Sequence, residues 1–198
     1  MWVRILHEFN SDWYPWGTFK DGNSIPKFKK SFRHIVDLLR ANGAGDNIKF
    51  QISYNAKSVH GDKIPFSAWW PGDEYVDMIM TTAYNRAGDS EGSNKPFLQF
   101  SELFPDSYKR VAALHPTLPI GIAECGSTDA DGEKAKGEWY LNMFKTLKTS
   151  DQFPRLKQVN VFMENKFLDW QLTTRQQQIA FGNGMRLLGY KAIKREGE

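Results

Sequence analysis

Two glutamates at the ends of short apolar segments are the residues of this sequence best suited to chemistry. Glu8 ends the segment that begins at Trp2, and Glu124 ends the segment that begins at Pro119. A pair of carboxyl groups on either side of a glycosidic bond is what glycoside hydrolysis requires, one as acid and base and the other as nucleophile or base. Taken alone, Glu8 also fits a solvated strand end.

An aromatic loop follows Glu8 directly. It contains Trp13, Tyr14 and Trp16, and flat apolar rings of this kind stack on the C–H faces of a pyranose. The alternative is that the rings cover the core, and for Trp13 that it covers the ends of helices. The loop and the two glutamates together favour sugar chemistry.

Composition and charge narrow the class of protein. The chain has 198 residues, of which 40% are hydrophobic and 25% charged, so we expect one domain over residues 1–198 with a sizeable core. The net charge of +3 is scattered, which argues against a nucleic-acid partner, since such binding needs a concentrated basic stripe. The single cysteine, Cys125, is expected to be a buried thiol. His7-Glu8 lacks a second histidine at zinc-binding spacing.

Hydrophobic periodicity predicts alternating strands and helices. The first strand is expected to run continuously to Glu8, which would place Arg4, Leu6 and Glu8 on one face. The other expected strands cover residues 48–55, 76–84, 120–124 and 159–165, and the expected helices cover 27–42, 101–115, 134–148 and 174–188. This order predicts an α/β fold in which helices cover a parallel sheet.

Five motifs, in this order, resemble those of glycoside hydrolase family 26, which holds β-mannanases together with lichenases and some xylanases. They are His7-Glu8-x-Asn10, Trp13 to Trp16, Trp70 to Asp77, Tyr84-Asn85 and Ile122-Ala123-Glu124-x-Gly126. The resemblance covers nearly the whole chain. It implies a retaining endo-glycosidase that cleaves β-1,4-mannosidic bonds by double displacement, with Glu8 as the acid/base and Glu124 as the nucleophile.

The resemblance also implies a set of substrate-binding residues. Trp13 matches a ring that stacks on sugar, Tyr84 matches a tyrosine that contacts the nucleophile, and near Val161 the family often has a tryptophan that this chain lacks. Trp170 either replaces that tryptophan or only packs. Asn10 and Asn55 either bind sugar hydroxyls or tie their loops. The expected set is His7, Asn10, Trp13, Tyr84, Trp70 and Trp170.

In the family, the strand that ends in His-Glu is the fourth of an eightfold (β/α) barrel. The resemblance therefore implies a partial (β/α)8 TIM barrel that matches strands four to eight. An open parallel sheet leaves unpaired edges. Three explanations stay open: a fragment of a longer product, which we favour, closure by another chain or a second copy, or an open α/β layer that folds alone.

Several alternatives for function also stay open. Within the family, the chain is a lichenase or a β-xylanase instead of a mannanase; outside enzymes, it is an inactive remnant that binds glycans. We expect a β-linked polysaccharide as partner, no nucleic acid or membrane, and no metal or organic cofactor, since the hydrolysis needs none. Members of the family are mostly secreted, but the N-terminal residues lack the basic and apolar regions of a signal peptide, so the location stays unassigned.

Overall fold

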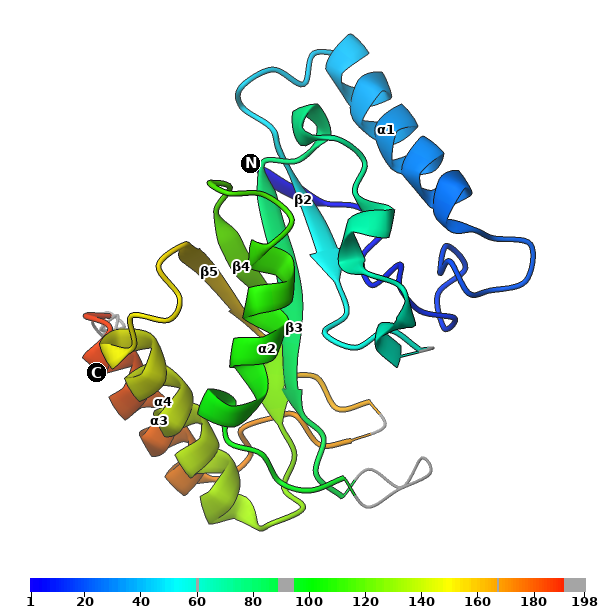
Figure 1. The fold of residues 1–198 in the computed structure, drawn as a ribbon. Helices are drawn as coiled ribbons and strands as arrows, with labels where there is room; N and C mark the ends of the chain where they lie inside the picture. The colour runs from blue at the N-terminus through cyan, green and yellow to red at the C-terminus, as the bar shows by residue number, and fades with distance from the viewer. Residues whose placement is uncertain (60, 89–94, 167, 191–198) are drawn as a thin grey trace. The chain divides into compact units, whose positions relative to one another are not determined.

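A computed structural model describes residues 1–59, 61–88, 95–166 and 168–190. Strands and helices alternate along the chain, as Figure 1 shows. The elements are β1 (Trp2–Arg4), α1 (Ile25–Ala41), β2 (Lys49–Tyr54), β3 (Met78–Asn85), α2 (Phe100–Ala112), β4 (Ile120–Ser127), α3 (Glu133–Thr149), β5 (Leu156–Val161) and α4 (Arg175–Leu187). Three short 3₁₀ turns lie between β2 and β3, at Gly61–Lys63, Phe66–Trp69 and Asp73–Tyr75.

The five strands form one sheet in the order in which they occur in the chain, β1-β2-β3-β4-β5. β1 pairs in parallel with β2, and β2 pairs in parallel with β3, with Val3 opposite Phe50 and Ile52 opposite Ile79. Helices α2 and α3 connect β3 to β4 and β4 to β5. Parallel neighbours require such crossover connections, so the predicted alternation of strands and helices is confirmed.

Helix α1 forms where the sequence predicts it. Ser24 caps its N-terminus by accepting a hydrogen bond from the Lys27 amide, and Pro26 occupies the first turn. Phe28, Phe32 and Val36 are buried along one side of the helix. The apolar stripe at helical spacing therefore packs against the core, and the proline sits where its missing N–H has no partner to lose.

The first strand is shorter than predicted. β1 ends at Arg4, and Leu6 and Glu8 both have positive φ angles, of 48° and 53°. A residue in this left-handed region cannot continue an extended strand. The prediction that Arg4, Leu6 and Glu8 follow one strand face is therefore wrong beyond Arg4, and Glu8 belongs to a turn.

The chain divides into two compact units. The first contains residues 1–82, 106–124 and 155–160, and the second contains residues 83–105, 125–154 and 161–198. β3 and β4 contribute residues to both units. We describe each unit by itself, and the expected single catalytic domain over residues 1–198 stays a prediction.

A buried lysine organises the second unit, in which α3 and α4 pack against each other. The Lys136 side chain of α3 is 0% exposed, and its Nζ lies 3.2 Å from Asp129 Oδ1 and 3.7 Å from Asp169 Oδ1. Nζ also donates to the Asp169 carbonyl at 3.0 Å, and Gln177 Nε2 of α4 donates to Asp129 Oδ1 at 3.1 Å. These bonds join the loops after β4 and β5 to both helices.

Replacing Lys136 by alanine is expected to lower the free energy of unfolding by about 3–5 kcal/mol, because two carboxylates lose their ammonium partner. Chemical denaturation measures this value. The matched control is Lys134→Ala on the same helix, which breaks an exposed pair with Glu138 at 3.6 Å. Exposed pairs of this spacing contribute about 0.3–0.5 kcal/mol. Equal effects of the two substitutions would contradict a structural role for the buried network.

The Cys125 thiol is buried, as the sequence predicts, and it lies 3.7 Å from Met143 Sδ. Among the described residues, no helix combines the length and the apolar character that crossing a membrane would take. Within the same residues, no group of three or more histidine, cysteine, aspartate or glutamate side chains is arranged to hold a metal ion.

Candidate active site

The turn that carries Glu8 is held by hydrogen bonds to its backbone. The Glu8 amide donates to the Ser53 carbonyl at the end of β2 at 2.8 Å, and the Ser11 hydroxyl donates to the Glu8 carbonyl. The indole of Trp16 donates to the His7 carbonyl at 2.8 Å. Non-glycine residues at positive φ cost about 1–3 kcal/mol each, so these bonds stabilise a turn that its own residues disfavour.

The Glu8 carboxyl lies in a mostly buried position. Glu8 is 7% exposed; its Oε1 accepts a hydrogen bond from Asn55 Nδ2 at 3.0 Å, and its Oε2 accepts one from Trp13 Nε1 at 3.2 Å. Burial raises the pKa of Glu8, and the charge of Glu124 raises it further, against smaller opposing effects of these two donors and Arg4. A raised pKa keeps a carboxyl protonated, as a general acid must be.

The raised pKa of Glu8 also links folding to pH. The folded chain holds this proton more tightly than the unfolded chain, so the group contributes stability at low pH and loses it as pH rises through the raised pKa. Glu8→Gln has no such titration. We expect the difference in Tm between Glu8→Gln and the parent to shift in favour of the variant as pH rises above 4.5, the ordinary pKa of the group. A difference that is independent of pH in thermal melts would contradict the raised pKa.

Glu124 has a different environment, although it belongs to the same unit. Arg4 Nη2 donates to Glu124 Oε1 at 3.0 Å, and Arg4 Nη1 donates to the Ala123 carbonyl at 2.9 Å. The guanidinium binds the Glu124 carboxyl group and the peptide before it at the same time, so Arg4 fixes the direction in which the Glu124 side chain points.

Tyr14 lies within electrostatic reach of both carboxyl groups and packs against the rings of His7 and Trp16. Tyr14 stacks on Trp16 with ring centroids 4.7 Å apart and planes 6° apart, and it meets the His7 ring edge to face at 4.6 Å. Burial raises the pKa of Tyr14, and the charges of Glu8 and Glu124 raise it further. The Tyr14 hydroxyl therefore senses both carboxylates and stays a neutral hydrogen-bond donor.

The predicted site residues of the first unit differ in their exposure and in their distance along the fold from Glu8. Trp13 is 47% exposed and hydrogen-bonded to Glu8, so its ring is available to a ligand. Asn10 is fully buried and exchanges two hydrogen bonds with the Asn55 backbone, at 2.8 and 2.9 Å. Trp70 donates to Asp73 Oδ1 at 2.8 Å in the segment that leads into the N-terminal end of β3. Glu8, by contrast, follows β1, and Glu124 lies within the C-terminal half of β4. The structure brings His7, Asn10 and Trp13 to Glu8, and it does not bring Trp70 there.

Tyr84 and Trp170 belong to the second unit, where they contact each other. Their ring centroids are 4.8 Å apart, and Phe162 meets Tyr84 edge to face at 6.1 Å. Trp170 is 7% exposed, and a Cβ at Gly126 would lie 2.9 Å from its ring. Trp170 therefore packs closely on the glycine that follows Glu124 by two positions.

Sequence reasoning did not single out two residues that contact a carboxyl group or sense its charge: Arg4 and Tyr14. The side chain of Arg4 looks like that of an ordinary strand residue, because its partner is 120 positions away. Tyr14 lies in the aromatic loop, but spacing does not distinguish it from the neighbouring rings. Asn55 was expected to bind sugar or to tie its loop, and its bond to Glu8 was not foreseen.

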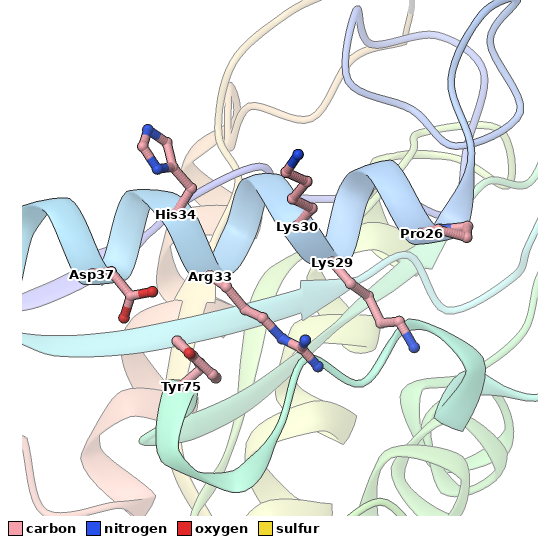
Figure 2. Close-up of a pocket in the computed structure, with 7 residues that line it drawn as sticks. All are labelled: Pro26, Lys29, Lys30, Arg33, His34, Asp37 and Tyr75. Carbon is pink, nitrogen blue, oxygen red and sulfur yellow. The ribbon is translucent and has the colours of Figure 1, made fainter.

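A shallow groove of about 460 Å³ lies elsewhere in the first unit, between α1 and the 3₁₀ turn before β3. Figure 2 shows its lining, which contains none of the predicted site residues. Its residues are Pro26, Lys29, Lys30, Arg33, His34, Asp37 and Tyr75. Arg33 is engaged with Tyr75, with its guanidinium carbon 5.6 Å from the ring centroid. The basic groove offers no carboxyl pair for glycoside chemistry.

Comparison with known proteins assigns the family. Residues 1–158 match the model of Glycosyl hydrolase family 26. The chain belongs to this family. It is 34% identical over 182 residues to Endoglucanase H of Acetivibrio thermocellus, covering 91% of this chain and 19% of that protein. It is 32% identical over 92 residues to a mannan endo-1,4-beta-mannosidase of Bifidobacterium adolescentis, covering 46% of this chain and 9% of that protein.

The structural comparison confirms the fold class. A modular endo-beta-1,4-mannanase from Cellulomonas fimi matches with a TM-score of 0.67 at 15% identity, over 91% of this chain and 40% of that chain. The fold is α/β and corresponds to part of a family 26 (β/α)8 barrel. The chain spans less than half the length of each of these three relatives. The matched family is one of glycosyl hydrolases.

Proposed function

We propose that this chain carries the catalytic carboxyl pair of a retaining endo-glycosidase that hydrolyses β-1,4-mannosidic bonds in mannan-type polysaccharides. One observation carries the proposal. Glu8 is buried with a raised pKa, while Glu124 is paired with Arg4 at 3.0 Å. A buried carboxyl group that holds its proton, together with a carboxyl group that an arginine holds in one orientation, suits the acid and the nucleophile of a double displacement.

In the first step, the Glu124 carboxylate attacks the anomeric carbon, and the bond to the leaving oxygen breaks. Glu8 gives its proton to that oxygen, so the leaving sugar departs as a neutral alcohol and a glycosyl ester remains on Glu124. In the second step, Glu8, now ionised, takes a proton from water, and the water oxygen attacks the anomeric carbon. Glu124 leaves as a carboxylate, Glu8 regains its proton, and the two inversions give net retention.

The residues around Glu8 have matching roles in this proposal. The exposed ring of Trp13 stacks on a sugar while its indole N–H holds Glu8 Oε2 at 3.2 Å. His7 lies beside Tyr14 and binds substrate hydroxyls, and Asn10 holds the Asn55 backbone so that Asn55 reaches Glu8. Tyr84, Trp170 and Trp70 stay predicted substrate contacts, and the contact of Tyr84 with Glu124 that the family resemblance implies stays a prediction too.

Mannan is proposed because the ordered motifs resemble those of β-mannanases and because one relative bears a mannosidase name. A β-glucan is the second candidate substrate. The relative named an endoglucanase matches 91% of the chain, which is twice the share matched by the mannosidase. Two further alternatives remain: the substrate is a β-xylan, or the chain is an inactive remnant that binds glycans. The same experiment tests both.

The test is release of reducing ends from galactomannan, glucomannan, lichenan and xylan by the chain as it exists, with proton NMR of the first anomer formed. We expect hydrolysis of the two mannans, with the β-anomer appearing first. Activity confined to lichenan or xylan would move the substrate to that polymer. A folded chain that binds these polymers and hydrolyses none would establish the remnant. An α-anomer formed first would exclude double displacement.

Light scattering addresses how the active species is assembled. The expected partners besides the glycan are a second copy of the chain or a preceding strand–helix segment. A mass twice that of the 22.8 kDa chain, in a preparation that hydrolyses mannan, would support closure by a second copy. A monomeric mass with activity would show that the five strand–helix units suffice.

Arg4→Met is expected to lower kcat by about 10²-fold, because it removes a charge-assisted bond that holds the attacking carboxylate. The Arg4 charge also lowers the pKa of Glu8, so its loss moves the alkaline limb of the pH–rate profile to higher pH. Arg4→Lys keeps the charge and serves as the matched control, with a smaller shift of that limb. Unchanged pH profiles in both variants would remove Arg4 from the site.

A further inference from the structure

Three amide side chains form a line of hydrogen bonds in the first unit that ends beside Glu124. Gln51 Nε2 of β2 donates to Gln158 Oε1 of β5 at 2.8 Å, and Gln158 Nε2 donates to Asn160 Oδ1 at 3.1 Å. Asn160 Nδ2 then donates to the Ala123 carbonyl at 3.2 Å. Ala123 immediately precedes Glu124 in β4, so the line runs from β2 through β5 to the peptide that carries the proposed nucleophile.

The three amides all donate in the same direction. The side-chain oxygens of Gln158 and Asn160 each accept a bond from the amide before them in the line, so their NH₂ groups face the next acceptor. The orientation of the Asn160 amide therefore follows from that of Gln158. Aligned hydrogen bonds polarise one another and strengthen the last bond of the line. The last bond of the line, from Asn160 Nδ2 to the Ala123 carbonyl, is therefore the one that this alignment strengthens.

The Ala123 carbonyl is held from two sides. It accepts the bond from Asn160 Nδ2 at 3.2 Å and a second bond from Arg4 Nη1 at 2.9 Å. Arg4 uses its other nitrogen to bind Glu124 Oε1 at 3.0 Å. Rotation of the peptide between Ala123 and Glu124 would break both bonds to the carbonyl and swing the Glu124 side chain, so the two donors fix the direction in which that side chain leaves the strand.

We propose that Asn160 is a positioning residue for glycoside cleavage, which holds the Ala123–Glu124 peptide so that Glu124 points at the anomeric carbon. The inference rests on the proposed role of Glu124 as the nucleophile. Asn160 acts through the bond that its Nδ2 donates to the Ala123 carbonyl. Because a displacement of about 1 Å in a reacting group costs about 10²-fold in rate, a loosened peptide lowers the rate of attack and leaves substrate affinity unchanged.

The test variant is Asn160→Asp, which keeps the size of the side chain. A carboxylate still accepts from Gln158 but has no proton to donate to Ala123, so the bond to the Ala123 carbonyl is lost while the bond from Gln158 is kept. The matched control is Asn142→Asp on α3, where the side-chain oxygen accepts from the Ser101 amide at 3.3 Å, a bond that a carboxylate also accepts. If Asn160→Asp fails to fold, Gln158→Glu takes its place. The carboxylate cannot donate to Asn160 Oδ1, so this bond no longer fixes the orientation of the Asn160 amide.

The readout is the rate at which a 2-deoxy-2-fluoro-mannosyl fluoride labels the chain, followed by intact mass and by the mass of the peptide that contains Glu124. We expect the parent and Asn142→Asp to label Glu124 at equal rates. Asn160→Asp is expected to label about 10²-fold more slowly, with kcat lowered in proportion and KM unchanged. Gln158→Glu is expected to slow labelling less, in the same direction.

Labelling of Asn160→Asp at the parent rate would overturn the positioning role while leaving Glu124 as the nucleophile. A change confined to KM would overturn it too, because it would place Asn160 in substrate binding. If the parent is labelled at a residue other than Glu124, or is not labelled, the proposed function fails and this inference fails with it. Labelling of the parent therefore distinguishes failure of the positioning role from failure of the proposed function.

Discussion

Replacing Glu124 by alanine is expected to reduce hydrolysis of the preferred polymer by about 10⁴-fold or more, because removing a covalent nucleophile leaves little beyond binding energy. The variant should still fold, since Arg4 and Glu124 retain side-chain exposures of 27% and 20% and water can solvate the guanidinium once its partner is gone. Initial rates of reducing-end release, with circular dichroism to verify folding, measure the effect.

The matched control for this variant is Glu138→Ala. Glu138 is exposed on α3, and its described ion pair is with Lys134 on the same helix. It loses the same number of atoms and the same charge, and should keep the parent rate. Added azide, a small anion that fits the space left by the side chain, should restore turnover of an activated aryl glycoside in Glu124→Ala and give a product of inverted configuration. A Glu124→Ala protein with more than a few per cent of the parent rate would remove Glu124 from the nucleophile role.

Replacing Glu8 by alanine is expected to lower polymer hydrolysis by about 10²–10⁴-fold, the usual contribution of a general acid and base. The loss should depend on the leaving group. A polysaccharide needs a proton on the departing oxygen, whereas a dinitrophenyl glycoside does not, so the first step on the aryl substrate should be nearly unaffected. Pre-steady-state bursts on the two substrates measure this contrast, and an equal loss on both would contradict an acid role.

The pH profile gives an independent check on Glu8. As a general acid it must be protonated, so the rate falls as pH rises through its pKa. Burial and the charge of Glu124 raise that pKa above the usual value of 4.5, so the alkaline limb lies at higher pH than an ordinary glutamate would give. In Glu8→Ala this limb should disappear on activated substrates. A limb that persists unchanged belongs to another group.

Helical and buried strand segments could be predicted from the sequence because their physical signals are local. Phe28, Phe32 and Val36 repeat at helical spacing after a serine cap, and they are buried in α1. The strand through Ile79 and the strand through Ile122 are short apolar runs, and both lie in the sheet. The two glutamates were found the same way, since each closes such a run.

The site geometry was less accessible because it depends on contacts between distant segments. Trp13 and Trp16 are three positions apart and chemically identical, yet one indole binds the Glu8 carboxylate and the other binds the His7 carbonyl. Asn10 fits either a sugar ligand or a loop tie by type, and the fold makes it a loop tie. The early end of β1 follows from bonds made by Ser53 and Trp16, which no spacing within residues 2–8 encodes.

The left-handed turn at Leu6 and Glu8 has a consequence for the order in which this region becomes native. Its backbone is unfavourable by itself, and the carbonyl that captures the Glu8 amide belongs to Ser53, at the far end of a separate strand. The turn therefore gains stability only after β2 has docked, and it is lost in any partial opening that withdraws β2. Amide hydrogen exchange at Glu8 should follow that at Ser53 through such an opening. The proposed acid is therefore held in position only while the neighbouring strand is in place.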